Sequence, residues 1–156
     1  MPSIVSIAYR PRNDALPLPA LSYFRVALDE ALLIEGHGIA DDAKAQPERN
    51  LNVMDAPTLA ELQAEGVPST PGALGENLVL EGIDLRLLAA GTQLHLGAEA
   101  VLEITRLRTG CAKLQRIAQR KPEEMAGRLG VLAQVVRAGR IQVGDRVELV
   151  QAGLPA

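Results

Sequence analysis

The chain has 156 residues, which suits one domain, because a domain of about 100–200 residues can bury a core without metal or disulfide crosslinks. Hydrophobic residues make up 47% of the chain and aromatic residues 2%, so the core must be aliphatic. The net charge of −3 offers no broad positive field, and together with the few aromatic rings it argues against nucleic acid as a partner.

Short segments rich in Val, Ile and Leu recur between Gly, Pro and Asp residues, a pattern typical of a sheet protein with many turns. Residues 4–8 predict the first strand. Residues 23–35 alternate imperfectly and predict one long or bent strand, which ends at Gly36-His37-Gly38. The stretch from there to residue 49 is small and charged apart from Ile39, and it predicts a surface-exposed loop.

The middle of the chain predicts a helix between two strands. Residues 51–54 predict a brief strand, after which Asp55 can cap a helix with Pro57 in its first turn. Gly66 ends that helix. A turn-forming stretch follows, and residues 77–80 predict the next strand.

The rest of the chain predicts antiparallel strands and one more helix. The strands are expected at residues 91–97, 100–107, 131–137 and 141–150. The helix is expected over residues 111–120 and ends before Pro122. A short connection at residues 138–140 joins the last two strands.

Strands outnumber helices in this pattern, and the regular alternation of strand and helix that marks a doubly wound parallel sheet is absent. We therefore predict a mainly β protein with mostly antiparallel strands and a few short helices, built as a β-barrel or β-sandwich. No internal repeat or break in composition marks a second domain, so residues 1–156 are expected to form one domain.

The sequence gives no sign of a membrane segment or of export. No apolar run approaches the roughly 20 residues that cross a bilayer, and the start MPSIVSIAYRPRN lacks the basic-then-apolar order of a signal peptide. The single cysteine, Cys111, cannot form an internal disulfide, which fits a reducing compartment. We expect a cytoplasmic protein with a free thiol.

Cys111 is the first candidate for chemistry. It is expected at the start of a helix, near unpaired backbone N–H groups and the positive end of the helix dipole, with Arg108 and Lys113 close in sequence. These groups stabilise a thiolate, which is the reactive and metal-binding form of cysteine. However, Cys111 also shares helical spacing with Leu114 and Ile117, and taken alone it is better explained as a small buried core residue.

Two other groups of polar residues are candidates for binding. Glu76 and Asn77 join a turn to a strand and could project at a sheet end, although turns commonly contain such residues. Asp42, Lys44 and Arg49 could grip an anionic ligand from the charged loop, although a solvated loop is the simpler interpretation.

The sequence argues against several common kinds of site. His37 and His95 have no Cys or His neighbour at zinc-ligand spacing. No phosphate-binding glycine loop, nucleophile elbow, Cys-x-x-Cys or closely spaced carboxylate pair is recognisable. Nucleotide-binding and hydrolase functions are therefore disfavoured.

Taken in order, six motifs of the chain resemble those of the MOSC domain, a family named for the C-terminal domain of molybdenum cofactor sulfurases. The motifs are Gly38-Ile39-Ala40-Asp41-Asp42, Arg49, Gly75-Glu76-Asn77-Leu78, Gly91-Thr92, Arg108-Thr109-Gly110-Cys111 and Gly144-Asp145-Arg146-Val147. The resemblance spans residues 4–150, and the ordered set is far more specific than any one motif.

The resemblance implies a β-barrel-like fold with one key cysteine, matched by Cys111, which in relatives carries a persulfide or ligates molybdenum in a pterin-bound cofactor. Thiolate sulfur is a suitable soft ligand for molybdenum, while cations and amides can hold the phosphate and ring edges of the pterin. By this resemblance, the residues expected to bind the cofactor are Asp42, Lys44, Arg49, Glu76, Asn77, Arg108 and Thr109. The chain departs from the family pattern at Asp41, where relatives carry glycine, and it lacks the second cysteine of some relatives.

Three functions stay open from the sequence. The first is a stand-alone MOSC domain that holds a molybdenum cofactor through Cys111 and reduces N-hydroxylated compounds with electrons from a partner protein. The second is a sulfur carrier that receives a persulfide on Cys111 from a donor protein for cofactor or metal-sulfur maturation. The third is a degenerate domain that binds only a small anion or another protein. We expect no pyridoxal phosphate domain of the kind found in full sulfurases, because residues 1–156 are assigned to the one MOSC-like domain.

Overall fold

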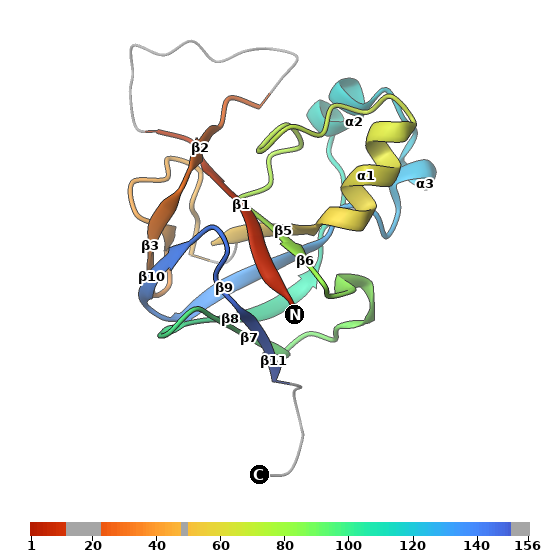
Figure 1. Cartoon of the computed structure of the whole chain (residues 1–156). Helices are drawn as coiled ribbons and strands as arrows, with labels where there is room; N and C mark the ends of the chain where they lie inside the picture. Colours follow the sequence, from red (N-terminus) through yellow and green to blue (C-terminus); the bar gives the residue numbers. More distant parts are fainter. Residues whose placement is uncertain (12–22, 48–49, 151–156) are drawn as a thin grey trace.

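The computed structural model describes residues 1–11, 23–47 and 50–150, and within these ranges it contains eleven strands, three α-helices and one 3₁₀ helix (Figure 1). In chain order the elements are β1 Ser3–Tyr9, β2 Val26–Leu28, β3 Glu30–Ile34, β4 Gly38–Ile39, β5 Leu51–Asp55, α1 Ala56–Ala64, β6 Leu78–Glu81, η1 Leu85–Leu87, β7 Gln93–Leu96, β8 Ala100–Leu107, α2 Ala112–Ala118, α3 Pro122–Met125, β9 Val131–Arg137, β10 Gly139–Gln142 and β11 Val147–Val150.

The strands form two sheets. Eight strands pair in the order β11-β7-β8-β9-β5-β6-β1-β2, and three pair in the order β10-β3-β4. Every described pairing is antiparallel except that of β5 with β6. The prediction of a mainly β, mostly antiparallel protein with few helices is therefore confirmed. Among the described pairings, none joins the outer strands of either sheet, so a closed barrel is not confirmed.

The beginning of β1 lies against the turn between β10 and β11. The N–H of Ile4 donates to the carbonyl of Asp145 at 3.0 Å, and the N–H of Gly144 donates to the carbonyl of Ile4 at 2.8 Å. The N–H of Val147 donates to the carbonyl of Pro2 at 2.9 Å. Residues at the start of the described chain thus bond through their backbone to the turn before β11 and to the first residue of β11.

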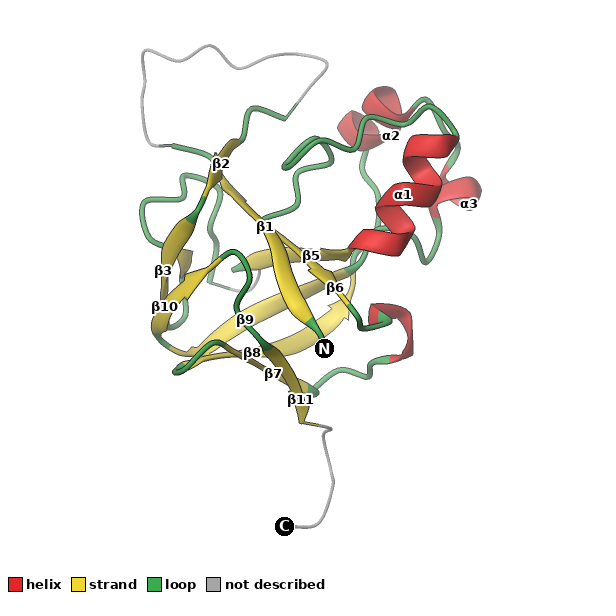
Figure 2. Ribbon diagram, viewed as in Figure 1, coloured by secondary structure: helices red, strands yellow, loops and turns green. Residues whose placement is uncertain are grey.

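Aliphatic side chains form two hydrophobic clusters, one on each face of β5. Because side chains alternate across a strand, Val53 enters the larger cluster between the sheets, while Met54 enters the smaller one. Leu62 of α1 and Leu114 of α2 pack in that smaller cluster. Figure 2 shows the three α-helices gathered on one side of the strands. The smaller cluster therefore fixes α2, which follows Cys111, against the sheet.

The helix predicted after residue 54 is confirmed, because the carboxylate of Asp55 accepts a hydrogen bond from the N–H of Thr58 at 3.0 Å and caps α1. The prediction of one strand over residues 23–35 is wrong. The chain leaves the first sheet after β2 and enters the second with β3, and the two strands are separated at Asp29. The carbonyl of Asp29 instead accepts from the N–H of Val143.

Three further expectations differ from the structure. Residues 141–150 do not form one strand, because Gly144, with φ of +96°, lies in a turn that separates β10 from β11. The connection expected at residues 138–140 contributes its last two residues to β10. The loop over residues 36–49 is not uniformly exposed, since Gly38 and Ile39 form buried β4 and Asp42 is buried.

The short helix α3 was not expected from the sequence. Its four residues follow Lys121, whose N–H donates to the carboxylate of Glu124 at 3.1 Å in a capping arrangement.

None of the described helices combines the length and the apolar character needed to traverse a bilayer.

Candidate functional site

A cleft of about 310 Å³ opens where the end of β8, the start of α2 and the segment before β2 meet. Its cationic lining residues are Arg10, Arg25, Lys44, Arg106, Arg108 and Lys113. No Asp or Glu belongs to the lining among the described residues. We call this hollow the cationic cleft. Such a concentration of one charge favours an anionic ligand.

Cys111 lies at the edge of the cationic cleft and is exposed. Pairing of β8 with β9 ends at Leu107, and Cys111 then takes the extended N-cap position of α2, with φ of −127° and ψ of 173°. Leu114 and Ile117 on the same helix are buried. The structure therefore excludes the core-packing interpretation of Cys111.

The surroundings of Cys111 lower its pKa below the ordinary value of a thiol. Burial opposes ionisation, but the backbone N–H of Leu114, the hydroxyl of Tyr23, the backbone N–H of Lys113 and the charge of Arg108 together outweigh it. The hydroxyl oxygen of Tyr23 lies 3.5 Å from Sγ. Thiolate is the form of cysteine that attacks electrophiles and binds metals.

Tyr23 stays protonated while Cys111 ionises. Burial, followed by the hydrogen bond to Cys111 and the negative charge of its thiolate, raises the pKa of Tyr23 to about 12. Tyr23 therefore acts as the donor toward a thiolate. The ammonium of Lys113 lies 4.9 Å from the centre of the Tyr23 ring, and the guanidinium of Arg25 lies 5.3 Å from it.

Asp42 and Asn77 organise the floor of the cleft. Oδ1 of Asp42, which is 1% exposed, accepts hydrogen bonds from the N–H groups of Arg10 at 3.2 Å and Lys44 at 3.0 Å. Its Oδ2 accepts from the side-chain amide of Asn77 at 3.1 Å, and that amide also donates to the carbonyl of Ala8 at 3.1 Å. The charged loop is thereby fastened to β1 and β6.

Glu76 is directed at the backbone rather than into the cleft. Its buried carboxylate accepts from the N–H groups of Gly72 at 3.0 Å and Leu74 at 3.2 Å, and burial raises its pKa above the ordinary value. The turn that it holds ends at Gly75, where an added Cβ would lie 3.2 Å from the ring of Tyr23. Glu76 thus shapes the wall on which Tyr23 rests, and a direct contact with a cofactor stays a prediction.

The structure brings most of the sequence-predicted residues together. The cleft lining includes Lys44, Asn77, Arg108, Thr109 and Cys111. Asp42 lies behind this lining through its contacts with Lys44 and Asn77. Arg49 lies outside the described residues.

Arg10, Tyr23 and Arg25 were missed from the sequence. Arg10 is only 5% exposed, and its Nη1 is buried without a hydrogen-bond partner among the described residues, as is Nε of Arg25. The guanidinium of Arg10 stacks 4.8 Å from the ring centre of Phe24. A signal was present, because two of the three aromatic residues of the chain adjoin each other immediately before Arg25.

Solved structures share the fold, among them YuaD and two YiiM proteins. YuaD from Bacillus subtilis has a TM-score of 0.75 at 18% identity, with 96% of each chain covered. YiiM from Geobacillus stearothermophilus has a TM-score of 0.75 at 21% identity, over 99% of this chain and 77% of that one. YiiM from Escherichia coli has a TM-score of 0.68 at 21% identity, over 96% and 70% respectively. At such identities the likeness concerns the fold alone.

A search of curated proteins gives no match. The family profile of the MOSC domain matches residues 40–148, which include β5 to β10, the first half of β11 and the loop that carries Cys111. The match covers more than half of the chain and agrees with the ordered motifs of the sequence. The chain belongs to the MOSC domain family.

Proposed function

We propose that the protein binds a molybdenum-pterin cofactor in the cationic cleft, with Cys111 as the sulfur ligand of the metal. One observation carries the proposal: an exposed thiol with a lowered pKa shares a cleft with six cationic side chains and, among the described lining residues, no carboxylate. A soft thiolate suits molybdenum, and a cationic cleft suits an anionic pterin phosphate.

The buried guanidinium groups test the fit of this cofactor. A buried polar nitrogen without an acceptor is unfavourable, so Nη1 of Arg10 and Nε of Arg25 favour a ligand that brings oxygen atoms. Asn52 and Asn77 add amide groups that suit the polar edges of a ring. The residues present therefore fit a cofactor with a phosphate, a polar ring and a metal.

In this proposal, different residues bind the phosphate, orient the sulfur of Cys111 and compensate negative charge beside it. Arg10 and Arg25 would bind the phosphate, and Tyr23 would orient Sγ of Cys111 through its hydroxyl. When bound, the cofactor supplies the redox chemistry by which relatives reduce N-hydroxylated compounds, with electrons from a partner protein. Lys113 and Arg108 would offset negative charge beside the sulfur.

Metal analysis of purified protein tests the proposal. We expect molybdenum in the wild-type protein and its loss in Cys111→Ala, with partial loss in Arg10→Gln. Arg137→Gln, which removes an exposed cation away from the cleft lining, is the matched control and should keep its molybdenum. Equal molybdenum in wild type and Cys111→Ala would overturn the proposal.

A second function rests on the exposure of Cys111. An exposed thiolate can attack the outer sulfur of a donor protein's persulfide, so that one S–S bond forms on Cys111 and the donor thiolate leaves. In that case intact-mass measurement would show a gain of one sulfur atom that dithiothreitol removes. Absence of both molybdenum and sulfane sulfur would favour the third alternative, a domain that only binds an anion or a protein.

A further inference from the structure

The thiol of Cys111 is accessible to small molecules in solution, because it lies exposed at the edge of the cationic cleft. The cleft has a volume of about 310 Å³, near the lower limit of roughly 300 Å³ for pockets that hold small molecules. The lowered pKa of Cys111 supplies a thiolate, the form of cysteine that attacks a disulfide sulfur. The charges around this sulfur therefore influence which disulfides reach it.

Several cations of the cleft are open to a reactant. Lys44 and Arg106 are exposed, and Lys113 is half-buried. Within the described part of the chain, none of these three forms an ion pair. Burial lowers the pKa of Lys113, and the positive charges of Lys44 and Arg25 lower it further. The cations of the cleft thus repel one another, and an anion among them would relieve this repulsion.

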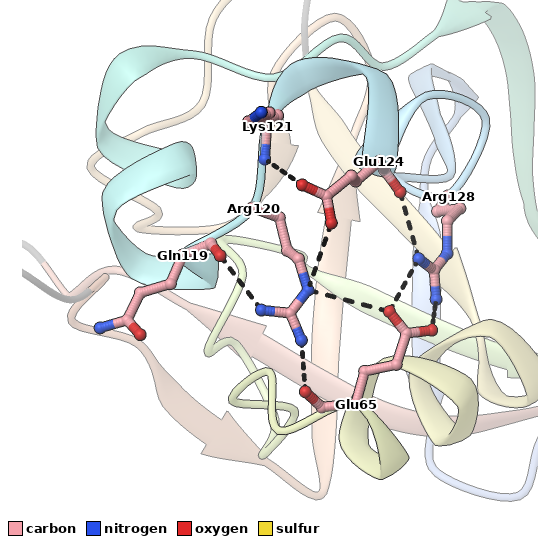
Figure 3. A network of polar contacts seen from close by, with 6 residues as sticks. All are labelled: Glu65, Gln119, Arg120, Lys121, Glu124 and Arg128. Atoms are coloured by element: carbon pink, nitrogen blue, oxygen red, sulfur yellow. Dashed lines mark hydrogen bonds and ion pairs between the residues drawn. The ribbon is translucent and has the colours of Figure 1, made fainter.

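Two cations next to α3 have carboxylate partners instead. Figure 3 shows Glu65, at the end of α1, facing the guanidinium groups of Arg120 and Arg128. Nη1 of Arg128 donates to the carboxylate of Glu65 at 3.1 Å. Nε of Arg120 lies 3.9 Å from the carboxylates of both Glu65 and Glu124. This network attaches α3 to α1 and neutralises its own cations, whereas the positive charge of the cleft is available to a ligand.

A buried guanidinium adds to the positive charge of the cleft. Arg10 is 5% exposed, and its Nη1 has no hydrogen-bond partner among the described residues. Its guanidinium stacks on the ring of Phe24, which also lines the cleft. A buried charge without a counterion is unfavourable, and a negative charge held in the cleft would offset this through space, without direct contact. The cleft therefore favours a reactant that carries a carboxylate near its sulfur.

We propose that Cys111 is a site of thiol–disulfide exchange with small disulfides whose substituents carry carboxylates. The thiolate of Cys111 attacks one sulfur of the disulfide, so that a new S–S bond forms on Sγ and the old S–S bond breaks. The other half of the reagent leaves as a thiolate with the bonding electron pair, and it is reduced while Cys111 is oxidised. The mixed disulfide holds a carboxylate in the cleft. It would also exclude a metal from Sγ, and this consequence alone rests on the proposed function.

Small disulfides of different charge test the proposal. The probes are dithiodipropionate, which carries two carboxylates, bis(hydroxyethyl) disulfide, which is neutral, and cystamine, which carries two ammonium groups. Intact mass measures the rate at which each forms a mixed disulfide with Cys111, the only cysteine of the chain. The protein is produced in cells that do not synthesise the pterin, so that no cofactor covers the thiol. Each rate is divided by that of the urea-unfolded protein with the same probe, which corrects for the different leaving groups.

The corrected rates should follow the charge of the probe. At low ionic strength we expect dithiodipropionate to react at least about tenfold faster than cystamine, with the neutral probe between them. In about 1 M salt, where the screening length falls to about 3 Å, the difference should largely disappear. Equal corrected rates at low ionic strength, or a faster reaction with cystamine, would overturn the proposal.

Three charge substitutions locate the origin of this preference. Lys44→Gln and Lys113→Gln each remove one charge from the cleft lining, whereas Arg116→Gln removes an exposed charge of α2 outside the lining. We expect each lysine variant to reduce the ratio of the two charged probes about threefold, and Arg116→Gln to leave it unchanged. Both probes react with the same thiolate, so a change in the pKa of Cys111 cancels in this ratio. Equal reductions by all three variants would contradict the proposal.

Molybdenum content is measured separately, in protein from cells that make the pterin. A preference for the anionic probe together with no molybdenum would overturn the proposed function and support the exchange site. Molybdenum together with no charge preference would do the reverse. The two failures are therefore distinguishable.

Discussion

The thiol of Cys111 differs from an ordinary surface thiol because its hydrogen bonds favour the ionised form. The Tyr23 hydroxyl, with a pKa raised to about 12, stays a donor at every pH at which the thiolate forms. Backbone N–H groups at the start of α2 and the charge of Arg108 act in the same direction. Reactivity at this residue therefore depends on a contact made across 88 positions of the chain.

Tyr23→Phe should slow alkylation of Cys111. The hydroxyl lowers the pKa of Cys111, so its removal raises that pKa and reduces the thiolate fraction at pH 7. We expect the rate of reaction with iodoacetamide to fall at pH 7 and its pH profile to move to higher pH.

Tyr9→Phe removes the other tyrosine of the chain and should leave the rate unchanged. In urea all three proteins should react alike, because the hydrogen bond is then lost. If Tyr23→Phe reacts at the wild-type rate at pH 7, Tyr23 does not support the thiolate.

The sequence predicted part of the site at the level of residues. Ordered motifs pointed to Cys111, Arg108 and Asn77, which lie together at the cationic cleft. Arg10 and Tyr23 were not predicted, because neither adjoins another candidate in sequence and only tertiary folding brings them to the cleft. The direction of the Glu76 carboxylate also could not be predicted, because a turn pattern does not specify with which backbone groups a side chain forms hydrogen bonds.

At the scale of elements, the buried carboxylate of Asp42 joins three segments that are distant in sequence. It accepts two backbone hydrogen bonds through Oδ1 and the amide of Asn77 through Oδ2. Asp42 therefore stabilises the fold directly, and by fixing these segments it also places Lys44 and Arg10 at the cleft.

Asp42→Asn should destabilise the protein. Asparagine has one acceptor oxygen, so its NH₂ group must face either backbone N–H donors or the amide of Asn77. A buried polar group left without a partner costs about 1–3 kcal/mol. Urea unfolding should therefore show a lower midpoint.

Asp41→Asn is the matched control for that change. Asp41 has φ of +66°, a left-handed conformation that asparagine adopts readily, and it is exposed. The urea midpoint of Asp41→Asn should equal that of the wild type. The role assigned to Asp42 is wrong if the two variants unfold at the same urea concentration.

Glu65→Gln should weaken the attachment of α3 in a pH-dependent way. Hydrogen bonding to Arg128 lowers the pKa of Glu65 in the folded protein. Its contribution to stability is then present above the pKa of the unfolded carboxyl, about 4.3, and is lost as pH falls through the lower folded value.

Thermal unfolding at several pH values measures this effect. The midpoint of Glu65→Gln should lie below that of the wild type at pH 7, and the two should converge in acid. Glu123→Gln removes a neighbouring exposed carboxylate of α3 and should show no such convergence. A midpoint difference that does not change with pH would contradict the ion-pair explanation.

Elements built from local patterns were predicted well. The bounds of β8 and β9 agree with the alternation of the sequence, and α1 begins and ends at its predicted signals. Pairing between distant strands could not be read locally. Residues 141–150 looked like one strand, because periodicity does not show that β10 pairs with β3 while β11 pairs with β7.

At the scale of the whole molecule, charge is unevenly distributed. The chain carries a net charge of −3, yet six of its sixteen Lys and Arg residues lie at one cleft. The rest of the chain therefore carries ten Lys and Arg residues against nineteen Asp and Glu residues. An anionic ligand is attracted at the cleft, and this attraction directs its approach.

Phosphate should stabilise the protein through the cationic cleft. A ligand that binds only the folded state raises the free energy of unfolding, by about 2.7 kcal/mol at one hundred times its dissociation constant. We expect millimolar phosphate to raise the thermal midpoint relative to chloride at equal ionic strength. The rise should be much smaller in Arg10→Gln and unchanged in Arg137→Gln. Equal rises in both variants would exclude Arg10 from the anion site.

The contact between Pro2–Ile4 and residues 144–147 has a consequence for how the chain folds. β1 cannot complete its hydrogen bonds until the end of the described chain is present, although β1 is synthesised before every other described element. Pairings of such high sequence separation slow folding to about milliseconds to seconds. During translation, the start of β1 would therefore stay without these hydrogen bonds until residues 144–147 have left the ribosome. An incomplete chain would expose unpaired backbone groups of β1, which can pair with other chains and lead to aggregation.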